Sequence, residues 1–533
     1  MDSGARTRSD CGRRVFVGGM AAGAGLALLP GRARAAPATF DVKRFGAVGN
    51  GKAMATKAIQ KAIDAGAAAG GGTVHVPPGR FLCGALFLRS NVHLDLAPGA
   101  ALVASQRFED FPAIDGRWEG IERKTYASLI NGSNLENVSL TGAGLLDGQG
   151  WPWWTAHEET KKLRLERKLP REAENPPGSP LKWPRPRLVN LFRCQNVAIR
   201  GVSAREAPSY TFHLVYCQDV VVDGVTLLGL EAQNSDGVVI DSSKRVRISN
   251  CSIGSGGECI SIKSGYNEDG RRVGLASEDI VVTNCNLQFS HGACVAVGSE
   301  TAGGVRNVLV SNCTASQARY GVHIRSPRGR GGVVEGIRVS NMTFDKIREA
   351  GVMISHFFDS VRMDGLFGEG QSAPDNPETD RTITLPVNEG TPSFQNLDFS
   401  GLTLNEVREV AVIEGLPERF ITGVQLRDVR VTGASVGVIL RRAANVVLEN
   451  VSLNAIPHPA VAARDVRGLE INRLRAARAR QAAPLVELEH VEQALIQGCT
   501  ARNTDDLVKL RGSRNHQISL QANTFNAATA STK

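Results

Sequence analysis

Residues 279–285 read DIVVTNC, and this alternation of apolar and polar residues, ending in Asn, recurs along the chain. Related segments are RVRISNC at 245–251, NVLVSNC at 307–313, GIRVSNM at 336–342 and NVVLENV at 445–451. Alternation with a period of two is typical of a half-buried β-strand. One such strand cannot bury its apolar face alone, whereas stacked repeats can. The pattern therefore predicts a solenoid of β-strands.

The last residues of the repeats indicate how the coils turn and pack. Asn tolerates the left-handed backbone of a tight corner, and stacked Asn side chains can form an amide ladder. The Asn residues in question are Asn250, Asn284, Asn312, Asn341 and Asn450. Cys251, Cys285 and Cys313 occupy equivalent positions, so we expect thiols stacked in an apolar core. We predict an all-β fold, a single-stranded right-handed parallel β-helix, with a β-propeller as the alternative.

The start of the chain carries two different signals. Residues 1–35 combine Arg13-Arg14, a short apolar run and a small-residue cleavage site, which resembles a twin-arginine export signal. Met54–Ala68 predicts a helix that caps the open end of the solenoid. We expect an exported protein, periplasmic or extracellular, with a β-helix catalytic domain at 36–525 and a disordered tail at 526–533.

One segment departs from the repeat. Residues 151–187 are charged and Pro-rich, and all five Trp lie between 118 and 183. These rings either form a rim that stacks on a sugar or anchor the insert to the β-helix body. A bulky insert also favours exo action, because it can block one end of a cleft.

Charge and composition exclude several classes of partner. The chain of 533 residues has a formal net charge of +9. Residues 1–35 carry six Arg and two Asp, so about +5 remains without them. This balance permits an acidic substrate without demanding one. With no nucleic-acid motif and no later transmembrane run, we expect a monomer without nucleic-acid or membrane partners.

Four polar segments interrupt the apolar pattern on successive repeats. They are QNSDG with Asn234 and Asp236, GGEC with Glu258, SHGAC with His291, and VHIRS with His323 and Arg325. Equivalent positions on neighbouring coils lie about 4.8 Å apart. We therefore expect one polar column of Asp236, Glu258, His291 and Arg325. Two carboxylates can hydrolyse a glycosidic bond with inversion, and their repulsion raises one pKa.

These segments resemble glycoside hydrolase family 28, the polygalacturonase family, over about residues 39–455. NSDG is similar to the family's N-T-D, and GGECISIKSG to its G-D-D-C-[IV]-x-[IL]-K-S-G. SHGACVAVGSE is similar to G-H-G-x-S-x-G-S-E, and HIR to R-I-K. The chain resembles an exported bacterial member with a divergent D-D motif. The family's usual general acid, the first Asp of D-D, is replaced by Gly257, and the second Asp by Glu258.

The resemblance implies a hydrolase of pectic, galacturonate-containing polysaccharide or oligosaccharide, without cofactor or metal. In this interpretation Glu258 is the general acid, Asp236 activates water and His291 orients the acid. The expected substrate-binding residues are Asn234, Lys263, His323 and Arg325. An Asp restored at position 257 is expected to raise activity on galacturonan if the rest of the site is intact. A catalytically impaired pectin-binding protein and a polysaccharide lyase are the alternatives.

Overall fold

The computed structural model describes residues 38–170, 173–229, 232, 234–357, 380–454, 457–477, 484–502, 504 and 506–526. The predicted export signal at 1–35 lies outside these residues, and so does the predicted tail beyond residue 526. Residues Ala38–Lys533 group into one compact unit. Within the described ranges, no helix is long and apolar enough to cross a membrane.

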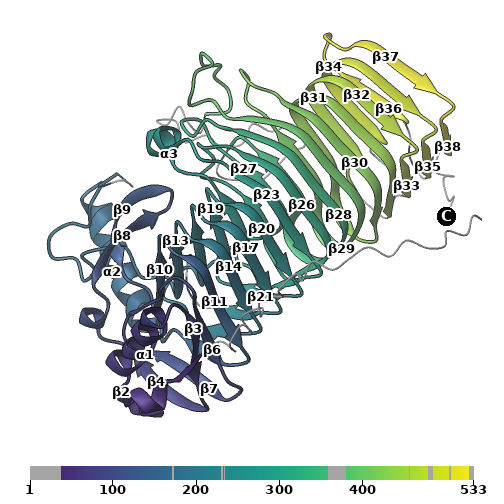
Figure 1. Cartoon of the computed structure of the whole chain (residues 1–533). Coiled ribbons are helices and arrows are strands. Elements are labelled where there is room, and N and C mark those ends of the chain that lie inside the picture. The colour runs from purple at the N-terminus through teal and green to yellow at the C-terminus, as the bar shows by residue number, and fades with distance from the viewer. Residues whose placement is uncertain are drawn as a thin grey trace, which may run out of the picture. The chain divides into compact units, whose positions relative to one another are not determined.

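The described residues form a right-handed parallel β-helix, as predicted, and the β-propeller alternative is wrong. Each coil contributes strands to three parallel rows, and each strand pairs with its equivalents on the preceding and following coils (Figure 1). The first row, which we call the site sheet, contains β5 (Leu86–Phe87), β10 (Ile130–Ser133), β13 (Val189–Phe192), β16 (Phe212–Val215), β19 (Val238–Asp241), β22 (Ile260–Lys263), β25 (Ala293–Val297) and β27 (Tyr320–Arg325).

Two further rows complete each coil. The second row contains β1 (Thr39–Asp41), β3 (Gly72–Val76), β6 (Val92–Leu96), β11 (Glu136–Gly142), β14 (Gln195–Arg200), β17 (Gln218–Asp223), β20 (Lys244–Ser249), β23 (Ser277–Thr283) and β26 (Val305–Ser316). The third contains β2 (Asn50–Met54), β4 (Gly79–Cys83), β7 (Ala100–Ala104), β12 (Leu145–Asp147), β15 (Ser203–Arg205), β18 (Thr226–Gly229), β21 (Ser252–Ser255) and β24 (Asn286–Gln288).

Later coils continue the same ladder, and several of their strands are long enough to turn from one row into the next. The strands of these coils are β28 (Val333–Ser355), β29 (Ser393–Glu414), β30 (Ile421–Val431), β31 (Ala434–Asn454), β32 (Val461–Asn472), β33 (Arg475–Ala477), β34 (Val486–Gln497), β35 (Thr500–Arg502), β36 (Val508–Arg511), β37 (His516–Gln521) and β38 (Thr524–Asn526).

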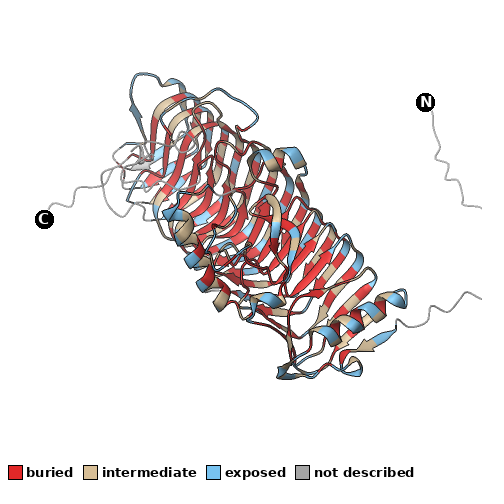
Figure 2. Ribbon diagram, turned by 90° about the vertical axis from the view of Figure 1, so that its left-hand side faces the viewer, coloured by how far each residue is buried: buried red, intermediate tan, exposed pale blue. Residues whose placement is uncertain are grey.

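The core lies inside the coils, where the apolar residues of the repeats stack in register. Val238 pairs with Ile260, Ile260 with Val295 and Val295 with Val322, and all four are buried (Figure 2). The alternate residues of the same strands point outward. This alternation is what the period-two pattern predicts, and it leaves the outer face of the site sheet available for polar side chains.

The corner and thiol predictions are confirmed, and the amide ladder is only partly formed. The five predicted Asn have φ between 53° and 56°, in the left-handed region. Only Asn341 donates to another of them, Asn312, at 3.1 Å among the described contacts. The stacked thiols Cys251, Cys285 and Cys313 are free and buried.

Helix α1 (Thr56–Ala68) covers the first coil and buries Ile59, Ala62 and Ile63. It begins two residues later than predicted. Met54 ends β2, and the next residue, Ala55, still donates its backbone N–H to Leu82 at 2.8 Å. Pairing with the neighbouring coil therefore delays the helix start.

The insert and an antiparallel hairpin flank the early coils of the site sheet. The hairpin consists of β8 (Ala113–Trp118) and β9 (Ile121–Tyr126), and the insert begins with α2 (Trp151–Glu166). Trp153 is fully buried and stacks on Phe108, with ring centroids 4.0 Å apart. Trp154 donates to the carbonyl of Ala207 at 3.0 Å. Both of these Trp therefore anchor the insert.

The other helices among the described residues are α3 (Asn267–Val273) and the short 3₁₀ turns η1 (Val42–Phe45) and η2 (Phe108–Asp110).

Candidate active site

Two carboxylates lie together where neighbouring strands of the site sheet begin. Asp236 precedes β19 by two residues and Glu258 precedes β22 by two residues, and the first residues of these strands are paired. The backbone N–H of Glu258 donates to Asp236 Oδ1 at 3.3 Å. Asp236 is almost completely buried, whereas the Glu258 side chain is 12% exposed. The one-coil step predicted from the sequence is therefore what brings these two groups together.

Two cations reach the carboxylates from the C-terminal ends of the strands, whereas the carboxylates lie at the N-terminal ends. Lys263, the last residue of β22, places Nζ 3.4 Å from Asp236 Oδ2. Arg325, the last residue of β27, donates from Nη2 to Glu258 Oε1 at 2.7 Å. Arg325 thus joins the predicted column through the length of its side chain, because its backbone lies at the far end of the strand. Each carboxylate has its own cation.

The two carboxyl groups have opposite protonation preferences. Burial, followed by the nearby charge of Glu258, raises the pKa of Asp236 to about 7. Burial also opposes ionisation of Glu258, but the charges of Arg325 and Lys263 and a hydrogen bond from Asp236 together lower its pKa below the ordinary value. One proton is therefore held between the two groups, and it resides on Asp236 in mildly acidic solution.

Gly257 provides the space that the Asp236 carboxyl group occupies. A Cβ atom built on Gly257 would collide with Asp236 Oδ1. The position of the family's usual acid side chain is therefore already filled from the preceding coil. This geometry argues against the expectation that an Asp restored at 257 would raise activity, since the new side chain and Asp236 would compete for one place.

Replacing Gly257 with Ala should lower kcat on pectic substrate by about 10-fold or more, because the added methyl group displaces the Asp236 carboxyl group. The control is Gly229→Ala, where a new Cβ would meet nothing closer than 3.9 Å. Steady-state kinetics and thermal melting of both variants check the effect. Wild-type kcat in Gly257→Ala would contradict this account of the position.

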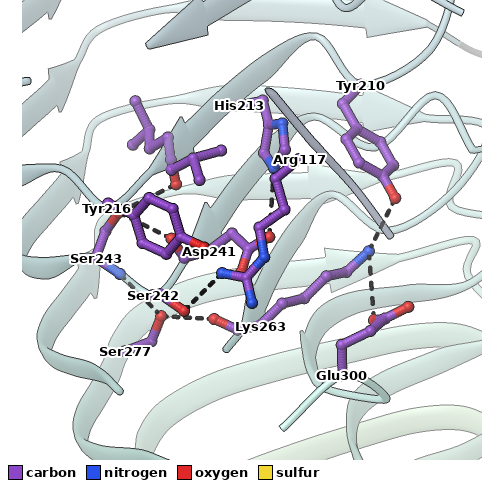
Figure 3. A network of polar contacts seen from close by, with 12 residues as sticks. Arg117, Tyr210, His213, Tyr216, Asp241, Ser242, Ser243, Lys263, Ser277 and Glu300 are labelled. Atoms are coloured by element: carbon purple, nitrogen blue, oxygen red, sulfur yellow. Dashed lines mark hydrogen bonds and ion pairs between the residues drawn. The ribbon is translucent and has the colours of Figure 1, made fainter. Parts of the chain in front are cut away.

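Lys263 is held by two residues that the sequence analysis did not include. Its Nζ donates to the Tyr210 hydroxyl at 3.3 Å and lies 3.9 Å from Glu300 Oε2 (Figure 3). Burial opposes the charged form of Lys263, but Tyr210, Glu300 and the two carboxylates raise its pKa well above the ordinary value. Lys263 therefore remains a cation although it is buried.

Both residues had a signal in the sequence. Tyr210 lies just before β16, one coil before Asp236, so the coil step used for the other polar residues reaches it. Glu300 is the final residue of SHGACVAVGSE, a segment compared with the family for its His.

The remaining predicted residues are His323, Asn234 and His291, and their environments differ. His323 is buried, and its Nδ1 lies 3.3 Å from Arg325 Nη1. Burial and the charges of Arg325 and Arg319 lower the pKa of His323 well below the ordinary value, so the ring is neutral. Asn234 donates to Glu119 Oε1 at 3.4 Å, at the edge of the site.

His291 does not join the carboxylates through any contact found among the described residues. Its side chain is exposed, on the turn before β25. The neighbouring Gly292 lies under Glu258, because a Cβ built on Gly292 would be 3.1 Å from Glu258 Cδ. His291 is therefore close to the site in sequence and exposed at its rim, and the structure gives it no orienting contact to either carboxylate.

A second buried ion pair fixes the hairpin above the site sheet. Arg117 of β8 lies 3.0 Å from Asp241 Oδ1 and donates to Ser242 Oγ at 2.8 Å (Figure 3). Both Arg117 and Asp241 are buried, and loss of either partner would leave an uncompensated charge. This pair positions Trp118, which stacks on Tyr210 with ring centroids 5.3 Å apart.

Comparison with protein families gives two matches that follow each other along the chain. Residues 115–363 match the model described as glycosyl hydrolases family 28. Residues 39–107 match the model described as rhamnogalacturonase A/epimerase, pectate lyase-like. The first match includes all of the candidate site residues, and the second covers the capping helix and first coils.

Individual relatives cover most of the chain. It is 30% identical over 397 residues to a "Probable polygalacturonase" of Vitis vinifera, covering 73% of each protein. It is 28% identical over 349 residues to an exo-poly-alpha-D-galacturonosidase of Dickeya chrysanthemi, covering 60% of this chain and 57% of that protein. The structure of a hyperthermoactive exopolygalacturonase from Thermotoga maritima superposes with a TM-score of 0.64 at 26% identity, covering 78% of this chain and 93% of that one.

Proposed function

Because the chain belongs to glycosyl hydrolases family 28, we propose that it hydrolyses glycosidic bonds of a pectic, galacturonate-containing polysaccharide or oligosaccharide by single displacement with inversion. The observation that carries the proposal is the carboxylate pair, in which the pKa of Asp236 is raised to about 7 and the pKa of Glu258 is lowered. This hydrolysis requires one carboxyl group that donates a proton and one ionised carboxylate that activates water.

In the proposed mechanism Asp236 is the general acid and Glu258 is the general base, which reverses the roles assigned from the sequence. Asp236 protonates the leaving oxygen, since its raised pKa keeps a proton available near neutral pH. Glu258 removes a proton from water, since its pairing with Arg325 keeps it ionised. For inversion, the water that Glu258 activates must attack the face of the sugar ring opposite the oxygen that Asp236 protonates.

The neighbouring cations and His323 are proposed to bind the sugar. Arg325 and Lys263 place positive charge beside the reacting bond, where the carboxylate of a uronate residue would be stabilised. His323 Nδ1 faces an Arg325 donor, so the ring proton is on Nε2. That Nε2 is buried without a hydrogen-bond partner among the described residues, which suits it to donate to a sugar hydroxyl.

Reducing-sugar release from galacturonan, rhamnogalacturonan and xylogalacturonan tests the proposed activity. We expect galacturonan to be cleaved, and proton NMR of the first product to show the inverted anomer. Failure to cleave any of the three would overturn the hydrolase proposal. A retained anomer would instead make Glu258 a nucleophile, which suits closely spaced carboxyl groups.

The pH dependence of kcat/KM should reflect the two carboxyl groups. Asp236 must be protonated, so the rate should fall as pH rises through about 7. Glu258 must be ionised, and because its pKa is lowered, the acid limb should lie below the ordinary glutamate range. A profile from about pH 2.5 to about pH 9 covers both limbs. A rate that stays constant well above pH 7 would contradict Asp236 as the acid.

A further inference from the structure

A cavity of about 270 Å³ lies between the insert and the hairpin. Its walls include Trp118 and Glu119 of the hairpin and Lys161 and Arg164 of α2. Arg185, near the end of the insert, also lines the cavity and is buried. The volume is slightly below the range of about 300–1,000 Å³ that holds drug-sized ligands, so it suits a single sugar residue.

The walls of this cavity are strongly cationic. Arg123, Lys161, Arg164 and Arg185 line it against one carboxylate, Glu119, so the charges sum to 4 − 1 = +3. His157 also lines the cavity, but burial and the adjacent cations lower its pKa to about 3, which leaves it neutral. A concave site with one sign of charge concentrates ligands of the opposite sign. The preferred ligand is therefore an anion.

Two contacts connect the cavity with the catalytic groups. Trp118, in its wall, stacks on Tyr210, whose hydroxyl accepts a hydrogen bond from Lys263. Glu119, also in its wall, accepts a hydrogen bond from Asn234, two residues before Asp236. The cavity is therefore linked to the carboxylate pair by two routes of contacting side chains, one by way of Tyr210 and Lys263 and the other by way of Asn234.

We propose that this cavity is a second uronate subsite, which binds the carboxylate of a sugar residue beyond the one held at the catalytic groups. The proposal rests on the proposed pectic substrate, whose successive residues carry carboxylates. Trp118 borders the space, and Arg185 and Lys161 supply positive charge to it. The subsite is built from the hairpin and the insert, so its residues lie outside the segments that carry the catalytic motif.

Two consecutive lysines of α2 provide a matched test. Lys161 lines the cavity, whereas Lys162 is exposed and is not part of its lining. Lys161→Met should raise KM for oligogalacturonate by about threefold to 10-fold with kcat nearly unchanged, as expected for lost binding at a half-exposed charge. Lys162→Met should change KM by less than about twofold. Equal KM values for the two variants would overturn the proposal.

A binding measurement separates this subsite from the catalytic proposal. Digalacturonate is titrated calorimetrically into Asp236→Asn protein, with and without Lys161→Met, and the methyl-esterified disaccharide serves as a neutral probe. We expect weaker digalacturonate binding in the double variant and no effect of Lys161→Met on the neutral probe. If binding depends on Lys161 but the wild-type protein does not hydrolyse the substrate, the subsite proposal stands and the hydrolase proposal fails. Hydrolysis with binding that ignores Lys161 would reject the subsite alone.

Discussion

Replacing Asp236 with Asn is expected to lower kcat on polygalacturonan by about 10²–10⁴-fold, the usual contribution of a general acid. Asn is isosteric with Asp, and its Oδ1 can still accept the backbone N–H of Glu258, which lies 3.3 Å from the present Oδ1. The fold should therefore persist. The variant should also lose the limb of the pH profile near 7, since the group that titrates there is removed.

A substrate with a good leaving group isolates the role of Asp236. In a nitrophenyl galacturonide the nitrophenolate leaves without being protonated. The kcat of Asp236→Asn should therefore fall by less than about 10-fold on this substrate. The control is wild-type protein on the same two substrates, with thermal melting to confirm folding. An equal loss on both substrates would mean that Asp236 acts through positioning or as a base, and the assignment of the acid would fail.

The fold followed from local sequence patterns because each coil repeats the same short pattern. The period-two alternation sets which residues of each strand face inward, and the Asn at each corner supplies the left-handed turn. Neither depends on contacts between distant segments. The helix start at Thr56 was missed because β2 pairing extends to Met54 and its neighbour, which is a tertiary contact that helix periodicity does not contain.

The members of the carboxylate pair were predictable, but their roles were not. Asp236 and Glu258 are one coil apart, and that step is legible in the sequence. Their protonation depends on burial and on which cation each contacts, and Arg325 reaches Glu258 from two coils away. Gly257 appeared to be a lost acid, whereas in the structure it is the space that Asp236 fills. Only the fold relates those two positions.

Glu258→Gln is expected to lower kcat by about 10²–10⁴-fold on both polygalacturonan and the nitrophenyl substrate, because each needs a base to activate water. Gln keeps an oxygen that can accept the hydrogen bond from Arg325, now 2.7 Å from Glu258 Oε1. The loss should therefore reflect the missing charge. Removing that charge should also lower the pKa of Asp236, since Glu258 helps to raise it. The alkaline limb of the residual activity should then move to lower pH.

An external nucleophile distinguishes a base from an acid at position 258. Glu258→Ala opens space where the carboxylate stood, and azide needs no base. Azide should attack the anomeric carbon as Asp236 gives its proton to the leaving oxygen, forming a glycosyl azide of inverted configuration. Rescue by azide in Glu258→Ala, and none in Asp236→Asn, would support the two roles. If Glu258→Gln instead kept its rate on the nitrophenyl substrate, Glu258 would be the acid, because only protonation of the leaving group becomes dispensable there.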